Sequence, residues 1–194
     1  MEKLPAYAIS PHFTTTDFPG KLTLDNKIDI FVDRVSGWQI GIATEIIKHN
    51  IQHSGFAVLQ IIMSYFETIG KYSSGYIGDH GSKVNFKIGM KRTFPEIGAE
   101  EEEFLNSFYE DVRNGLYHIG LTKTNVGLFC DIPGSIGFNQ KENKLVICPE
   151  RLVEDIDIRF RSFTEDLRDP KNEALRKNFE LRFDYDNSPP MPLS

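Results

Sequence analysis

Arginine, asparagine and histidine side chains that could act on a phosphate occur together in the segment from Arg113 to His118. Arg113 is a permanent cation that can bind a phosphate through two hydrogen bonds. Histidine can transfer protons near neutral pH, which suits His118 to acid–base catalysis, and Asn114 can orient either side chain or a substrate hydroxyl. Together they could cleave RNA without a metal. His118 would move a proton at the 2′-hydroxyl or the leaving oxygen, and Arg113 would stabilise the charge on phosphorus, giving a 2′,3′-cyclic phosphate.

The helix that carries this segment is expected to begin near Gly98 and to continue to Ile119. One side of it is apolar, with residues at four-residue steps: Phe104, Phe108, Val112 and Leu116. The opposite side carries, in angular order, Arg113, Tyr117, Asn114 and His118. Arg113 and His118 are about 140° apart on an ideal helix, so a distortion at Gly115, the long arginine side chain or a facing helix must bring them together. By itself, the spacing is more typical of a solvated polar face.

A second helix, earlier in the chain, is expected to start at a capping Ser54 and to be buried on most sides, because apolar residues cover most of its circumference. Its polar residues step by four, three and four positions and form one stripe: Gln60, Ser64, Glu67 and Lys71. A buried carboxylate is costly unless it is paired, so this stripe needs a partner. Glu67 is therefore a candidate accessory residue of the site, and Tyr117 is the other.

The N-terminal part of the chain predicts an irregular arm over residues 1–24, which hold three prolines, followed by an amphipathic helix from a capping Asp25 to Ile46. Residues 82–92 could form a strand or a short helix, and we favour the helix.

The C-terminal part predicts a small β-hairpin and two helices. Residues 125–147 have short apolar pieces separated by turn residues, which is typical of a small two- or three-stranded hairpin element. Pro149 suits the first turn of a long helix, and Asp169-Pro170 ends it before a shorter helix. We expect a single, mainly α domain over residues 25–183 and a disordered tail over residues 184–194.

The charge balance argues against strong binding of nucleic acid. The 194 residues carry a formal net charge of -6, whereas nonspecific nucleic-acid binders usually have a basic excess. A modest basic cluster is either solvated surface or a local patch that receives RNA: Lys83, Lys87, Lys91 and Arg92.

The sequence also predicts a cytoplasmic protein without a membrane segment, metal or cofactor. No signal peptide is evident before Pro19, and the window from Phe56 to Ile69 is too short and too polar to span a bilayer. Cys130 and Cys148 are interpreted as packed thiols. His49 and His53 have the spacing of a helical metal pair, but no further ligand motif accompanies them and a surface or capping role is favoured.

The stretch from Phe108 to Gly120 resembles the signature of the HEPN superfamily (higher eukaryotes and prokaryotes nucleotide-binding). That signature is an arginine, usually followed by a polar residue, and a histidine four to six residues further on, near the end of a core helix; here these are Arg113, Asn114 and His118. The resemblance implies an up-and-down helical bundle with a small β-hairpin insertion before the last long helix. It also implies a homodimer whose arginine and histidine segments line a shared cleft.

The leading hypothesis is thus a HEPN-like, metal-independent endoribonuclease in a toxin or anti-phage setting, with RNA as substrate and an antitoxin or other regulatory protein as a further partner. The alternative is a catalytically silent helical module that binds nucleotide or a protein. A third hypothesis is that dimer packing alone explains the polar side of the helix that carries Arg113 and His118. The sequence leaves open whether Arg113 and His118 meet within one subunit or across two.

Overall fold

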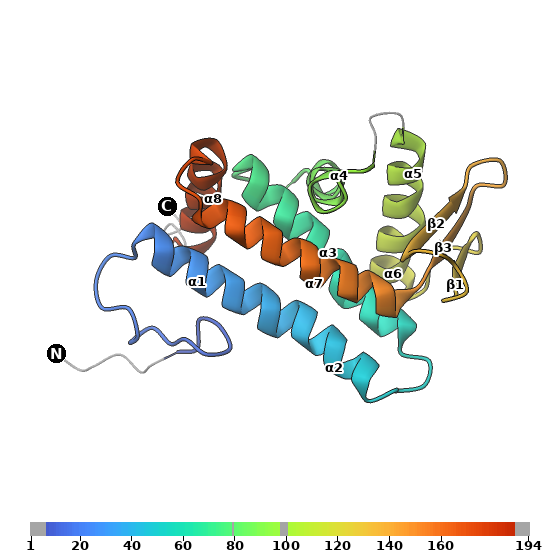
Figure 1. The fold of residues 1–194 in the computed structure, drawn as a ribbon, viewed down its shortest axis with the longest axis horizontal. Coiled ribbons are helices and arrows are strands. Elements are labelled where there is room, and N and C mark those ends of the chain that lie inside the picture. Colours follow the sequence, from blue (N-terminus) through green and yellow to red (C-terminus); the bar gives the residue numbers. More distant parts are fainter. Residues whose placement is uncertain (1–6, 79, 98–100, 189–194) are drawn as a thin grey trace, which may run out of the picture.

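The computed structural model describes residues 7–78, 80–97 and 101–188 and is mainly helical, with one small sheet (Figure 1). In chain order, the helices are α1 (Leu24–Arg34), the π-helical segment η1 (Val35–Gly41), α2 (Ile42–Lys48), α3 (Gly55–Ser74), α4 (Ser82–Thr93), α5 (Glu102–Ser107), the π-helical segment η2 (Phe108–Arg113), α6 (Asn114–Ile119), α7 (Pro149–Arg168) and α8 (Glu173–Asn187). No helix in the described ranges is long and apolar enough to cross a membrane.

The first helix runs without a break through α1, η1 and α2. Thr23 is its N-cap and forms a capping box with Asn26, in which each side chain bonds the other residue's backbone N–H. The prediction that Asp25 is the N-cap is therefore wrong; Asp25 lies in the first turn, where its charge favours the helix dipole. The arm before it is tied down, because Ser10 and His12 both hydrogen-bond to the Asp33 carboxylate.

The long helices α3 and α7 build the core. Figure 1 shows α7 running beside α1 and α2, with α3 packed against α7 and α8. Aromatic rings fill the space between these helices, and those that are almost fully buried include Phe31, Tyr65, Phe66, Phe160 and Phe179.

Helices α3 and α4 cross with their backbones in contact at Gly70 and Gly89. A Cβ added to Gly89 would lie 1.7 Å from the Phe66 carbonyl oxygen, and one added to Gly70 would lie 1.8 Å from that of Asn85. Residues 82–92 lie within α4 and are helical, as favoured from the sequence. Ser82 does not cap this helix, because Gly81 occupies the N-cap in a left-handed conformation.

The sheet lies beside α5 and α6, before α7 (Figure 1). Strands β2 (Ile136–Asn139) and β3 (Lys144–Ile147) form the expected hairpin. The third strand, β1 (Val126–Leu128), pairs with the other edge of β3 in parallel, giving the order β1-β3-β2. Pro149 begins α7, as expected, with Cys148 at its N-cap.

The predicted start of one helix and the predicted start of the disordered tail are wrong. The helix of the Arg113 segment begins at Glu102, while Gly98 lies outside the described residues. Helix α8 continues to Asn187, so the boundary at residue 183 falls inside a helix. This last turn is held by ion pairs, since Asp184 contacts the buried Lys27 and Asp186 contacts Arg182. The ends of the expected arm and tail, residues 1–6 and 189–194, also lie outside the described residues.

Candidate functional site

The segment from Arg113 to His118 lies where a π-helical turn passes into an α-helix. Segment η2 ends at Arg113, and α6 carries Asn114, Tyr117 and His118 before it ends at Gly120, which has a φ of 73°. The expected distortion at Gly115 is thus one turn earlier in the chain. Gly115 allows close packing instead, because a Cβ there would lie 2.5 Å from the Leu121 carbonyl oxygen. Single π-helical turns often occur at functional sites.

The Arg113 guanidinium is held on several sides. Its Nη2 atom lies 3.2 Å from the Glu67 Oε2 atom, and its Nη1 atom donates a hydrogen bond of 3.1 Å to the Asn114 Oδ1 atom. The guanidinium carbon is 4.4 Å from the centre of the Tyr117 ring and 5.4 Å from that of Tyr109, so it makes cation–π contacts one turn before and one turn after itself. The Arg113 side chain is 16% exposed, which leaves a limited face open to a ligand.

Glu67 is the carboxylate that the polar stripe of α3 presents to Arg113. Its Oε2 atom also accepts a hydrogen bond of 2.6 Å from the Ser82 hydroxyl, and its Oε1 atom lies 3.0 Å from the Lys71 Nζ atom. Burial raises the pKa of Glu67, but hydrogen bonds from Ser82 and Lys71, with the charges of Lys71 and Arg113, hold it below its usual value. Glu67 is therefore ionised at neutral pH.

Asn114 links Arg113 to a second carboxylate. While its Oδ1 atom accepts from Arg113, its Nδ2 atom donates a hydrogen bond of 2.9 Å to Glu110. Glu110 in turn lies 2.9 Å from the Lys83 ammonium of α4. The Asn114 amide is thus oriented from both ends.

His118 lies outside this network. It occupies the last turn of α6, is exposed, and forms no hydrogen bond or ion pair with any residue that the structure describes. Two exposed apolar side chains follow it, Ile119 at 67% and Leu121 at 53% exposure. Of the five candidate residues, the structure therefore brings together Arg113, Asn114, Tyr117 and Glu67, and leaves His118 pointing its polar ring to the surface.

The basic cluster is not a free patch for RNA. Lys83 pairs with Glu110, and Lys87 and Lys91 both pair with Glu102. Arg92 pairs with Asp166 of α7 and also covers the Phe163 ring. Each of the four cations therefore has a carboxylate partner, which cancels much of the field that a phosphate backbone would meet.

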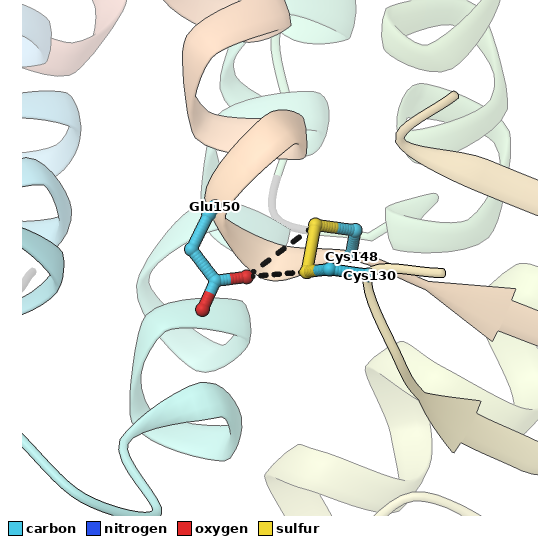
Figure 2. Close-up of side chains that lie close together, drawn as sticks. All are labelled: Cys130, Cys148 and Glu150. Atoms are coloured by element: carbon cyan, nitrogen blue, oxygen red, sulfur yellow. Dashed lines mark hydrogen bonds between the residues drawn. A yellow bond between two sulfur atoms is a disulfide. The ribbon is translucent and has the colours of Figure 1, made fainter. Parts of the chain in front are cut away.

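The interpretation of the cysteines as packed thiols is wrong. Cys130, just after β1, and Cys148, at the N-cap of α7, form a disulfide (Figure 2). Figure 2 also shows the Glu150 carboxylate beside both sulfur atoms. The Glu150 Oε2 atom is 2.8 Å from the Cys130 Sγ atom and 3.4 Å from the Cys148 Sγ atom.

Three partners of the Arg113 site were missed by sequence reasoning. Glu110 and Tyr109 lie one helical turn before Asn114 and Arg113, so helical spacing could have identified both. No pattern in the sequence indicates that Ser82, at the start of α4, meets Glu67.

A cavity of about 550 Å³ lies elsewhere, between α5, β2 and α7. Its wall includes Phe104, Phe138 and Asp155 but none of the five candidate site residues. A ligand of the Arg113 network would therefore bind outside this cavity.

Comparison of the chain with protein-family models, with curated proteins and with solved structures found no match.

Proposed function

We propose that this chain is a metal-independent endoribonuclease of the HEPN type, with Arg113 as the phosphate-binding group, His118 as the acid–base group and Asn114 as the orienting group. One observation carries the proposal: an arginine held by four neighbouring side chains lies five residues before an exposed histidine at the end of the same continuous helix. In-line cleavage by a 2′-hydroxyl requires a preorganised cation at the phosphate together with a proton-transfer group, so a facing surface would have to bring His118 to an arginine.

The chemistry assigns one step to each side chain. His118 takes the proton of the ribose 2′-hydroxyl as the 2′-oxygen attacks phosphorus, or protonates the leaving 5′-oxygen. The Arg113 guanidinium stabilises the extra charge on the phosphoryl oxygens, and a bound phosphate would compete with the Glu67 carboxylate for it. The products would be a 2′,3′-cyclic phosphate and a 5′-hydroxyl.

A homodimer belongs to this proposal, because the cleft needs a surface opposite α6. The exposed Ile119 and Leu121 beside His118 support an apolar contact there. A toxin or anti-phage setting, with an antitoxin or other regulatory protein as partner, is the biological context that the resemblance implies.

A second function is a catalytically silent module that binds nucleotide or a protein partner. Two observations favour it: Glu67 already neutralises Arg113, and the four cations of α4 are paired with carboxylates. Together with the net charge of -6, they weaken the attraction for a long RNA.

The decisive assay incubates the protein with single-stranded RNA in EDTA. We expect the wild type to cleave. His118→Ala should lose about 10²- to 10⁴-fold in rate, as is typical when an acid–base group is removed, and Arg113→Ala about 10²- to 10³-fold. His49→Ala and Arg159→Ala are matched controls, since both side chains are exposed and lie outside the Arg113 network.

Intact RNA at high protein concentration would favour the silent module. If His118→Ala and Arg113→Ala cut as fast as the wild type, the cleavage comes from elsewhere and the assignment is wrong.

A further inference from the structure

The Glu150 carboxylate lies beside the Cys130–Cys148 disulfide, and a disulfide does not explain this position. The Glu150 Oε2 atom is close to both sulfur atoms, at 2.8 Å and 3.4 Å. A disulfide carries no S–H, so neither sulfur can donate a hydrogen bond to a carboxylate. These distances suit an arrangement in which a proton or a cation lies among the three atoms.

Backbone hydrogen bonds hold Cys148 and the residue before Cys130 in place independently of the sulfur–sulfur bond. Cys148 N donates a hydrogen bond of 2.9 Å to the Ser135 carbonyl, and its own carbonyl accepts one from Leu152 in the first turn of α7. Phe129 N donates to the Ile147 carbonyl, which extends the β1–β3 pairing to the residue before Cys130. Reduction of the disulfide would therefore leave both thiols at the end of two paired strands.

We propose that, in the reduced protein, Cys130, Cys148 and Glu150 bind one Zn²⁺ through two thiolates and one carboxylate oxygen, with a fourth position open to water. The two sulfur atoms and the carboxylate oxygen all lie within 4.8 Å of one another. This is the donor set that zinc takes from proteins, and three protein ligands with one open position is its usual arrangement at reactive sites. Sulfur donors exclude Mg²⁺ and Ca²⁺, which prefer oxygen.

The electrostatic setting also favours thiolates. Cys148 is the N-cap of a 20-residue helix, where backbone N–H groups and the helix dipole stabilise negative charge. Cys148 is buried, so its thiolate needs a cation more than an exposed one would.

The two states exclude each other. A dithiol reductant breaks the S–S bond, delivers two electrons and two protons, and becomes a disulfide itself. Zn²⁺ then replaces the two thiol protons, which pass to water, as two Zn–S bonds form. Oxidation to the disulfide removes both thiolate ligands and releases the metal.

The test uses the full chain, reduced with a phosphine, desalted without oxygen and titrated with Co²⁺ and then with Zn²⁺ against a chromophoric chelator. We expect one metal per chain, with thiolate-to-cobalt charge-transfer absorption, and no binding by the oxidised protein. Glu150→Gln and Cys130→Ser should each weaken Zn²⁺ by at least about 10-fold, the lower bound seen even for residues that only support a ligand. Glu154→Gln, one turn further along α7, is the matched control.

Either of two results would overturn the proposal. Reduced protein that binds no metal leaves a structural disulfide, or a thiol exchange pair if it also reduces disulfides of other proteins. Unchanged affinity in Glu150→Gln removes the carboxylate from the site. Circular dichroism of each variant checks folding, and no readout depends on RNA cleavage, so this proposal and the nuclease can fail separately.

Discussion

At the scale of the residue, Arg113 is a partnered cation and not a free one. Glu67 neutralises it, Asn114 orients it and two tyrosine rings cover it. Such a group is preorganised, which favours catalysis, but a phosphate must displace or share the Glu67 contact. The ionisation of Glu67 therefore controls both the stability of this region and the availability of Arg113.

The lowered pKa of Glu67 predicts how this pairing responds to pH. Because the folded pKa lies below the unfolded one, the unfolded chain binds more protons in acid, so the stabilisation is present above about pH 5 and is lost as pH falls through the folded pKa. Glu67→Gln should cost stability at pH 7 and less at pH 4 in urea unfolding. Glu165→Gln, exposed on α7, is the control; an equal cost of Glu67→Gln at both pH values would contradict this linkage.

Helical spacing predicted part of this site. The stripe of α3 singled out Glu67, and the structure pairs it with Arg113. Of the two alternatives for the basic cluster of α4, the patch that receives RNA loses support, because carboxylates from α5, η2 and α7 pair with these cations. Local periodicity contains no information about such partners.

At the scale of the element, the crossing of α3 and α4 positions Ser82 and Lys83 against the site. The crossing depends on two glycines whose hydrogen atoms face the opposite backbone. Backbone atoms move little without disturbing both helices, so a side chain at this point cannot be accommodated cheaply.

Gly89→Ala should therefore destabilise the protein by about 3 kcal/mol or more, at the upper end of the cost of overpacking. Gly134→Ala is the control, because its nearest neighbour would lie 4.0 Å from the added Cβ. Chemical denaturation of both variants checks this. A Gly89→Ala protein as stable as the wild type would mean that the two helices do not cross this closely.

Sequence patterns predicted the helices that have long apolar stripes. They did not predict the strand pairing and the disulfide, which depend on tertiary contacts. The apolar steps predicted α3 and α7, and Pro149 and Asp169 located the bounds of α7. The parallel pairing of β1 with β3 was not predictable, because short strands with turn residues between them suggest only hairpins. The disulfide was missed for a related reason: strand pairing brings Cys130 and Cys148 together across 18 residues.

At the scale of the whole molecule, the proposed site can be formed by one copy of the chain or by two. His118 is exposed at the end of α6 while Arg113 faces α3. This arrangement fits a site in which the arginine of one copy works with the histidine of another.

Mixing the Arg113→Ala and His118→Ala proteins tests that arrangement. In a shared site, half of the dimers are mixed and each has one intact site of two, so about a quarter of the wild-type activity should return. Each variant alone, and Arg113→Ala mixed with the double variant, are the controls. A mixture as inactive as its components would place the arginine and the histidine of each site in the same subunit.

The most direct test of the nuclease proposal is the chemistry of the cut ends. A single-stranded RNA is incubated with the protein in EDTA and the fragments are weighed by mass spectrometry, beside the same RNA carrying 2′-O-methyl groups. We predict fragments with 2′,3′-cyclic phosphate and 5′-hydroxyl ends from the first RNA, and no cleavage of the second. Fragments with 3′-hydroxyl ends, or cleavage of the methylated RNA, would contradict attack by the 2′-hydroxyl and with it the roles of His118 and Arg113.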